Sequence, residues 1–122
     1  MEPNGFKELT LILKQYEPLT EYNRNILYNK SIKDIVFQLR AQLEDVKSNG
    51  KISCSVSLDR NALSIGSHYL RIEVELIEEE KNKLSQLKRT DSILFSGIIE
   101  ALLYSNSDCW YYVTMRDCRL ID

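Results

Sequence analysis

The 122-residue sequence has few of the residues that form disulfide bridges, nucleophilic or metal sites, and glycine-rich phosphate-binding loops. It contains three cysteines, one histidine, four glycines and two prolines. An odd number of cysteines at unrelated spacings does not fit a disulfide framework and favours a reducing compartment. The glycines are isolated from one another, so the sequence has no glycine-rich loop that could cradle a phosphate. The length fits a single domain that can bury a core without such staples.

The sequence also lacks a strong excess of charge of either sign. Its formal net charge is −2. Non-specific affinity for nucleic acid comes from many lysine and arginine contacts to phosphate groups. This chain therefore does not hold a polyanion by charge alone, and any nucleic-acid contact is expected to be local, on one face.

Long apolar runs are absent as well. The longest, around residues 93–103, is interrupted by Ser96, Gly97 and Glu100. It is shorter than the roughly 20 residues that span a bilayer. The N-terminus has neither the basic start nor the apolar segment of a secretory signal. We therefore expect no membrane association and a cytoplasmic location.

No residue pattern indicates catalysis or metal binding. His68 is the only histidine, and no serine or cysteine has the glycine context of a nucleophile elbow. Cys109 and Cys118 lie near the ends of one predicted strand, roughly 30 Å apart and on opposite faces. That separation excludes a disulfide or a shared zinc ion, although Cys54 could meet one of them across strands. We expect a non-enzymatic protein without a metal or cofactor.

Helical spacing of apolar residues dominates the first 50 residues. It predicts a helix over 6–16, which Pro18 interrupts, and another over 19–27. A third stripe begins within residues 31–34, which resemble a capping box, and a stop is expected at Asn49-Gly50. The stripe that predicts this third helix consists of Ile32, Ile35, Val36, Leu39, Leu43 and Val46.

The period of the apolar residues changes to two after Lys51. Strict alternation predicts strands over 52–58 and 70–76. Between them, residues 59–61 predict a turn into a short strand around 63–65, and a slip of one residue is expected near Gly66. Residues 78–88 are charged and predict a short helix.

Two strands are predicted in the C-terminal third. Residues 93–104 fit both a helix and a strand, but Gly97 in the middle and the adjacent Ile98-Ile99 favour a strand. Residues 110–121 predict the last strand. The order after residue 50 is then β-β-β-α-β-β, the order of a five-stranded OB-type barrel. We predict an α+β protein, with a helical extension over 1–50 packed on an OB-like barrel over 51–122.

Two segments resemble bacterial OB-fold proteins of the tRNA-anticodon-binding-like type. Residues 84–97 read LSQLKRTDSILFSG, similar to a short helix, a leucine-lysine turn, an Asp and an apolar-x-Phe-Ser-Gly strand. Residues 113–121, VTMRDCRLI, are similar to the last barrel strand of that family, which often ends in Asp-Cys. The family usually has glycine where this chain has Thr90, which puts the turn there in question. The resemblance implies a binding module, commonly assigned to nucleic acid by fold alone.

The predicted last strand offers a candidate binding surface. Alternation places Tyr111 and Met115 toward the core and an aromatic, arginine-containing set on the outer face. Such a set can stack on the bases of single-stranded nucleic acid, although the N-terminal helices could equally cover this face. The candidate nucleic-acid-binding residues are Trp110, Tyr112, Arg116, Lys88 and Arg89.

A second hypothesis assigns binding to the N-terminal helices. The stripe of residues 32–46 would then pair with a protein partner or with a second copy of this chain, giving a homo-oligomer. The sequence does not decide between a nucleic-acid module and a protein-interaction module.

Overall fold

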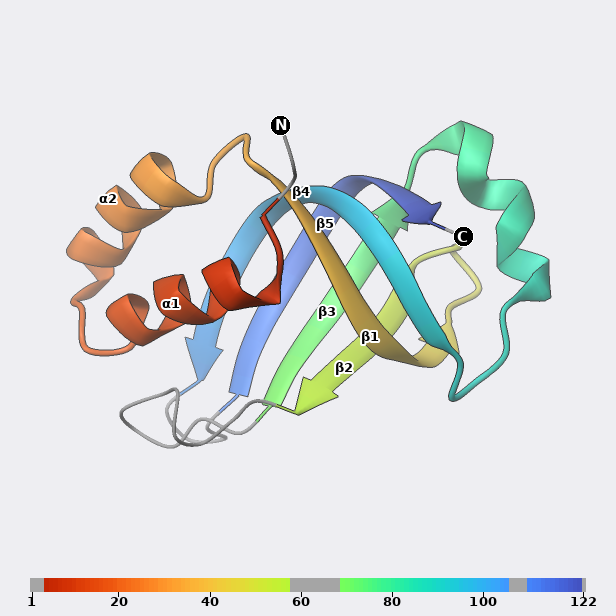
Figure 1. The fold of residues 1–122 in the computed structure, drawn as a ribbon, viewed down its shortest axis with the longest axis horizontal. Helices are drawn as coiled ribbons and strands as arrows, with labels where there is room; N and C mark the ends of the chain where they lie inside the picture. Colours follow the sequence, from red (N-terminus) through yellow and green to blue (C-terminus); the bar gives the residue numbers. More distant parts are fainter. Residues whose placement is uncertain (1–3, 58–68, 106–109, 122) are drawn as a thin grey trace.

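The computed structural model describes residues 4–57, 69–105 and 110–121 of the chain. Two helices come first, and a short 3-10 helix lies between the third and fourth of five strands (Figure 1). The elements are α1 (Phe6–Tyr16), α2 (Glu21–Ser31), β1 (Val36–Val46), β2 (Ile52–Ser57), β3 (Tyr69–Leu76), η1 (Glu78–Gln86), β4 (Ser92–Ser105) and β5 (Trp110–Ile121).

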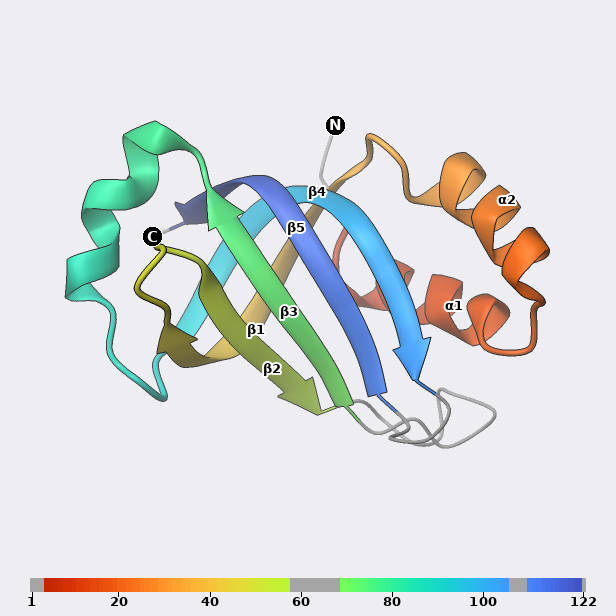
Figure 2. The ribbon, with the colours of Figure 1, turned by 180° about the vertical axis from the view of Figure 1, so that it is seen from behind.

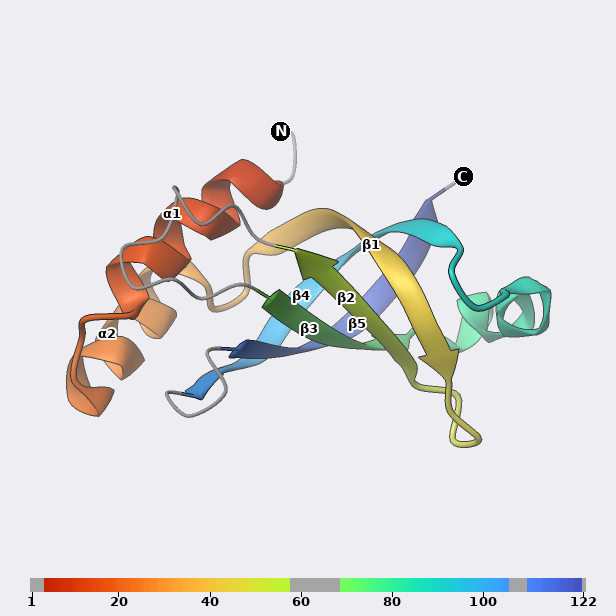
Figure 3. The same ribbon diagram turned by 90° about the horizontal axis from the view of Figure 1, so that it is seen from below.

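The five strands close into a barrel in the order β1-β2-β3-β5-β4. All neighbouring pairs are antiparallel except β3 and β5, which run parallel. The helices lie at one end of this barrel and η1 lies at the other (Figure 3). The predicted α+β class with an OB-like barrel is confirmed, as are the strands over 70–76, 93–104 and 110–121.

The helices form where the sequence predicts the first two. The carboxylate of Glu8 accepts a hydrogen bond from the Gly5 N–H (2.9 Å) and so satisfies a free donor at the start of α1. At the start of α2 the hydroxyl of Thr20 accepts from the Asn23 N–H (3.3 Å). Helix α1 buries Leu9 and Leu13 in the barrel core, whereas α2 buries none of its residues.

The third predicted helix is wrong, because residues 36–46 form strand β1. Leu39 and Leu43 are four residues apart, a spacing that fits one face of a helix and also one face of a strand. Phe37, Leu39, Ala41 and Leu43 are buried in alternation with polar residues, and β1 pairs with both β2 and β4. The helix stop expected at Asn49-Gly50 is instead the β1–β2 turn, where Gly50 has a φ of +87°.

This correction removes the helical surface proposed for protein pairing. Ile32, Leu39 and Leu43 are buried in the core, Ile35 and Val46 pack partly against it, and only Val36 is exposed. The barrel therefore begins at Val36, inside the segment expected to be a helical extension. The turn at 59–61, the short strand near 63–65, the slip at Gly66, and the residues His68 and Cys109 lie outside the described ranges.

Candidate nucleic-acid interface

Strands β3 and β5 place four side chains on one patch of the outer barrel surface. Their parallel register pairs Tyr69 with Trp110 and Arg71 with Tyr112. The residues that alternate with them along both strands are buried in the core. We call the set Tyr69, Arg71, Trp110 and Tyr112 the aromatic face. The predicted inward positions of Tyr111 and Met115 are confirmed.

The rings of the aromatic face are stacked. The ring centroids of Tyr69 and Trp110 are 4.7 Å apart with planes 23° from parallel. Tyr112 follows Trp110 by two residues along β5, and its ring centroid is 6.3 Å from that of Trp110 with a plane angle of 22°. The guanidinium carbon of Arg71 lies 5.0 Å from the Trp110 centroid, which is cation–π geometry. Tyr69 is 43 % exposed, so the platform reaches solvent.

The helices pack elsewhere on the barrel. The Tyr16 hydroxyl donates to the carbonyl of Leu102 (2.8 Å). The Tyr28 hydroxyl donates to the carbonyl of Ile99 (2.9 Å). These contacts hold α1 and α2 against the second half of β4. Figure 2 shows the outer side of β3 and β5, with both helices to one side and neither lying across these strands. The N-terminal helices therefore do not cover the aromatic face.

The structure brings together only two of the five predicted binding residues, Trp110 and Tyr112. Arg116 lies farther along β5, in ion pairs with Asp34 (3.8 Å) and Asp117, so its charge is balanced locally. Lys88 and Arg89 precede the first residue of β4, whereas Trp110 pairs with Ser105, the last residue of that strand. These two basic residues are thus at the opposite end of the barrel from the aromatic face.

Tyr69 and Arg71 were not among the predicted binding residues. Arg71 occupies an outward position of the predicted strand over 70–76, so its orientation could be read from the sequence. Tyr69 precedes that predicted strand by one residue and is the first residue of β3. Their contact with Trp110 and Tyr112 depends on the β3–β5 register, which joins residues about 40 positions apart in the chain. No pattern within either segment of the sequence predicts how β3 and β5 are aligned.

The charges around the aromatic face are nearly balanced. Arg71 lies 3.5 Å from the carboxylate of Glu44. Farther along β3, Glu73 pairs with Lys47 (3.0 Å) and Lys51 (3.4 Å). Hydrogen bonding from Lys47, followed by its charge and that of Lys51, lowers the pKa of the Glu73 carboxyl despite partial burial. The aromatic face therefore carries little net charge, and stacked rings are its main feature.

The two cysteines in the described ranges are not reactive groups. Burial raises the pKa of the Cys54 thiol and of the Cys118 thiol to about 12. Both thiols thus stay protonated at neutral pH, and a protonated thiol is a poor nucleophile and metal ligand. Among the described residues, no group of three His, Cys, Asp or Glu side chains is placed to hold a metal ion.

No helix within residues 4–57, 69–105 or 110–121 is long and apolar enough to cross a membrane.

Comparison with known proteins finds distant structural neighbours and no matching family. No protein-family model matches the sequence, and no curated protein matches it. The chain is similar to the mitochondrial single-stranded DNA-binding protein Rim1 of S. cerevisiae, at 9 % identity and a TM-score of 0.40, over 71 % of this chain and 92 % of that one. It is also similar to a Plasmodium falciparum SSB solved in complex with ssDNA, at 12 % identity and a TM-score of 0.32, over 71 % and 94 %. The strand order defines an OB-type barrel, and its outer surface carries the stacked rings of Tyr69, Trp110 and Tyr112.

Proposed function

We propose that this protein is a non-enzymatic binding module that holds single-stranded nucleic acid by stacking bases on the aromatic face. The observation that carries the proposal is the stacked arrangement of Tyr69, Trp110 and Tyr112 on the outside of β3 and β5, with Arg71 over the indole. Aromatic platforms of this kind accept any base, because every base has a π-face.

Stacking on this face supplies affinity with little help from charge. One stacked base contributes about 1–3 kcal/mol. Arg71 is the only cation on the aromatic face, so few phosphate contacts are expected. For single strands the salt slope is about −0.7 per phosphate neutralised. We therefore expect modest affinity with a shallow salt dependence, unlike that of a strongly basic nucleic-acid-binding protein.

The test is a titration of the protein into fluorescein-labelled oligothymidine, followed by anisotropy at low salt. Trp110 is the only tryptophan, so quenching of its emission by unlabelled oligothymidine reports contact at the aromatic face directly. A duplex of the same length serves as the comparison, because paired bases do not offer their faces for stacking. We expect the single strand to bind and to quench Trp110, and the duplex to bind more weakly.

A matched pair of tyrosine variants locates the site. Tyr69→Ala removes one ring of the platform and should weaken binding about 5- to 150-fold, the equivalent of one lost stacking contact. Tyr22→Ala removes a tyrosine that is 76 % exposed on α2, away from the aromatic face, and should leave the affinity unchanged. Undetectable binding at low salt, or equal effects of the two variants, would contradict the proposal.

A further inference from the structure

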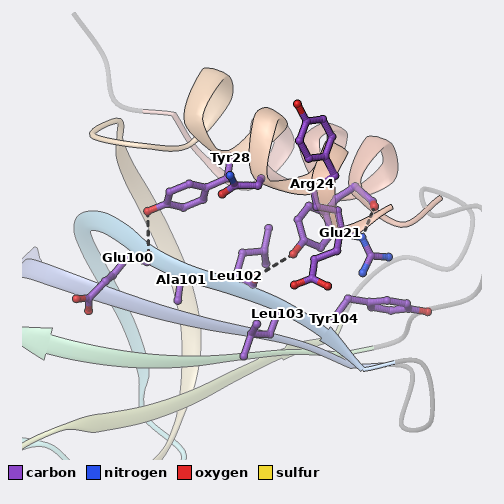
Figure 4. A pocket seen from close by; sticks show the side chains of 11 residues that line it. Glu21, Arg24, Tyr28, Glu100, Ala101, Leu102, Leu103 and Tyr104 are labelled. Carbon is purple, nitrogen blue, oxygen red and sulfur yellow. Dashed lines mark hydrogen bonds between the residues drawn. The ribbon is translucent and has the colours of Figure 1, made fainter. Parts of the chain in front are cut away.

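A groove of about 820 Å³ lies between α2 and the second half of β4. This volume is in the range of about 300–1,000 Å³ that ligand sites occupy. Figure 4 shows Tyr28 and Glu100 at one end of the groove, Glu21 and Tyr104 at the other, and Leu102 and Leu103 between them. It is separate from the aromatic face, although Leu103 pairs with Tyr112 across β4 and β5.

A bulge in β4 gives the groove an apolar rim. Between Ile99 and Ala101, β4 advances two residues while β5 advances one, and this inverts the alternation of inward and outward side chains. Leu102 is consequently buried and Leu103 is 65 % exposed. Among the large hydrophobic residues described, Leu103 and Tyr22 are the most exposed, and both line this groove. Clustered exposed apolar side chains mark interaction sites.

The backbone edge of β4 in the groove is partly capped by tyrosines. The hydroxyl of Tyr28 lies 2.9 Å and 2.8 Å from the carbonyls of Ile99 and Glu100, and that of Tyr16 donates to the carbonyl of Leu102 (2.8 Å). These hydrogen bonds occupy carbonyls that a bound peptide would need in order to pair with β4 as an additional strand. Such a peptide must be recognised mainly through its side chains.

The charge of the groove favours a cationic ligand. Its lining carries two carboxylates and one guanidinium, so its formal charge is −1. The guanidinium of Arg24 is engaged within the groove: Nε and Nη2 donate to the carbonyls of Tyr16 (3.0 Å) and Glu17 (2.7 Å), and its carbon lies 4.7 Å from the Tyr16 ring centroid and 5.5 Å from that of Tyr104. Within the described ranges, Glu21 and Glu100 form no ion pair. A phosphate backbone would meet these carboxylates unfavourably.

We propose that this groove docks a short basic and apolar segment of a partner protein. Lysine or arginine side chains of the segment pair with Glu21 and Glu100 at the two ends of the groove. A large apolar side chain between them packs against Tyr22 and Leu103. The proposal is independent of the proposed nucleic-acid function, because it uses different residues and the opposite sign of charge.

The probe is a short fluorescein-labelled peptide in which lysine alternates with leucine, titrated with the whole protein and followed by anisotropy. Two comparison peptides replace lysine by glutamate or leucine by serine. We expect the lysine-leucine peptide to bind most tightly, because only it matches both the charge and the apolar rim. Absence of binding up to the solubility limit, or equal binding of the glutamate-leucine peptide, would overturn the proposal.

Charge reversals test the two carboxylates. Glu21→Lys and Glu100→Lys should each weaken the lysine-leucine peptide about 5-fold, and the double variant should move the preference toward the glutamate-leucine peptide. The matched control is Glu79→Lys, an equal change of charge at an exposed position on η1, at the other end of the barrel. If Glu79→Lys weakens the peptide as much as Glu100→Lys does, net charge alone explains the binding and the groove is not the site.

Apolar variants separate the groove from the aromatic face. Leu103→Ser should weaken the peptide about 10-fold or more, whereas Tyr69→Ser should not change its affinity. Single-stranded oligothymidine should not compete with the peptide. Competition that is lost in the Tyr22→Ala variant would make the groove part of a nucleic-acid path and overturn the assignment to a peptide. Failure of oligothymidine to bind anywhere would contradict only the nucleic-acid function.

Discussion

At the scale of single residues, Thr90 occupies a backbone conformation that suits glycine. Its φ is +74°, in the left-handed region, where a β-branched side chain is disfavoured. The turn is held by a hydrogen bond from the Thr90 N–H to the Leu43 carbonyl (2.9 Å) and by one from the Lys88 N–H to the Asp91 carboxylate (2.8 Å). The position that departs from the OB-fold resemblance in sequence thus keeps a turn of the kind that glycine would form.

Replacing Thr90 by glycine should therefore stabilise the protein. Relief of the left-handed strain outweighs the extra entropy of glycine in the unfolded chain, for a net gain of about 1 kcal/mol in the free energy of unfolding. Urea unfolding measures this difference. Lys88→Gly is the control, since Lys88 is in the same turn without a positive φ and should show no gain. A loss of stability in Thr90→Gly would show that the turn depends on the threonine side chain.

Gly97 is required for a different reason, close packing of β4 against β5. A Cβ added at Gly97 would overlap the Sγ of Cys118 and lie 3.0 Å from the Arg116 carbonyl oxygen. The Phe-Ser-Gly and Asp-Cys segments that carry the resemblance therefore meet at this contact. Gly97→Ala should lower the free energy of unfolding by about 1–3 kcal/mol through overpacking. In a double-mutant cycle, Cys118→Ala should reduce that loss, and strictly additive losses would argue against the contact.

At the scale of elements, the sequence predicts a segment correctly when only one period fits it. The segments at 52–57 and 70–76 alternate strictly, and both are strands. In β1 the spacing of Leu39 and Leu43 fits two periods, and the pairing of β1 with β2 and β4 decides the outcome. In β4 the bulge after Ile99 turns Leu103 outward, although an uninterrupted alternation predicts it inward. Tertiary pairing sets both features, so local reasoning misses them.

The candidate site follows the same division. The outward positions of Trp110 and Tyr112 come from alternation within one strand and are predictable. The contributions of Tyr69 and Arg71, and the separation of Lys88 from the aromatic face, depend on strand order and register around the closed barrel. The sequence shows that Lys88 and Arg89 are adjacent basic residues, but it does not show at which end of the barrel they lie.

The ion pairs between β3 and the β1–β2 turn predict an acid-dependent stability. The pKa of Glu73 is below its ordinary value of 4.5, so its carboxylate stabilises the fold at neutral pH. That contribution is complete above pH 4.5 and is lost as the pH falls through the lowered folded pKa. Because the side chain is one-third exposed, the contribution is below about 1 kcal/mol.

The comparison of Glu73→Gln with the native chain isolates this term. Urea unfolding at pH 7 should show the variant to be less stable, and the difference should shrink in acid, where Glu73 is protonated in both folded and unfolded chains. Glu79→Gln, at an exposed position on η1, should show a smaller difference at both pH values. A difference for Glu73→Gln that does not change with pH would mean that its charge is not the cause.

At the scale of the whole molecule, helix α1 and the barrel share one core. Leu9 and Leu13 of α1 are fully buried in the same cluster as the barrel residues, and the Tyr111 hydroxyl donates to the Leu13 carbonyl (3.2 Å). Strand β1 follows α2 directly and pairs with both β2 and β4, so the segment before residue 50 supplies part of the barrel wall. Helix α1 and the barrel strands therefore depend on the same buried contacts.

This shared core predicts that the chain unfolds in one cooperative transition. Far-ultraviolet circular dichroism follows secondary structure including α1, and Trp110 emission follows the barrel at β5, so the two urea curves should coincide. Leu13→Ala removes buried methyl groups at the junction and should shift both curves together, by about 2–5 kcal/mol. If the helical signal is instead lost at lower urea than the Trp110 signal, α1 and the barrel are separate cooperative units. If both signals of the Leu13→Ala variant are lost at the same lower urea concentration, Leu13 stabilises barrel strands that are distant from it in the sequence.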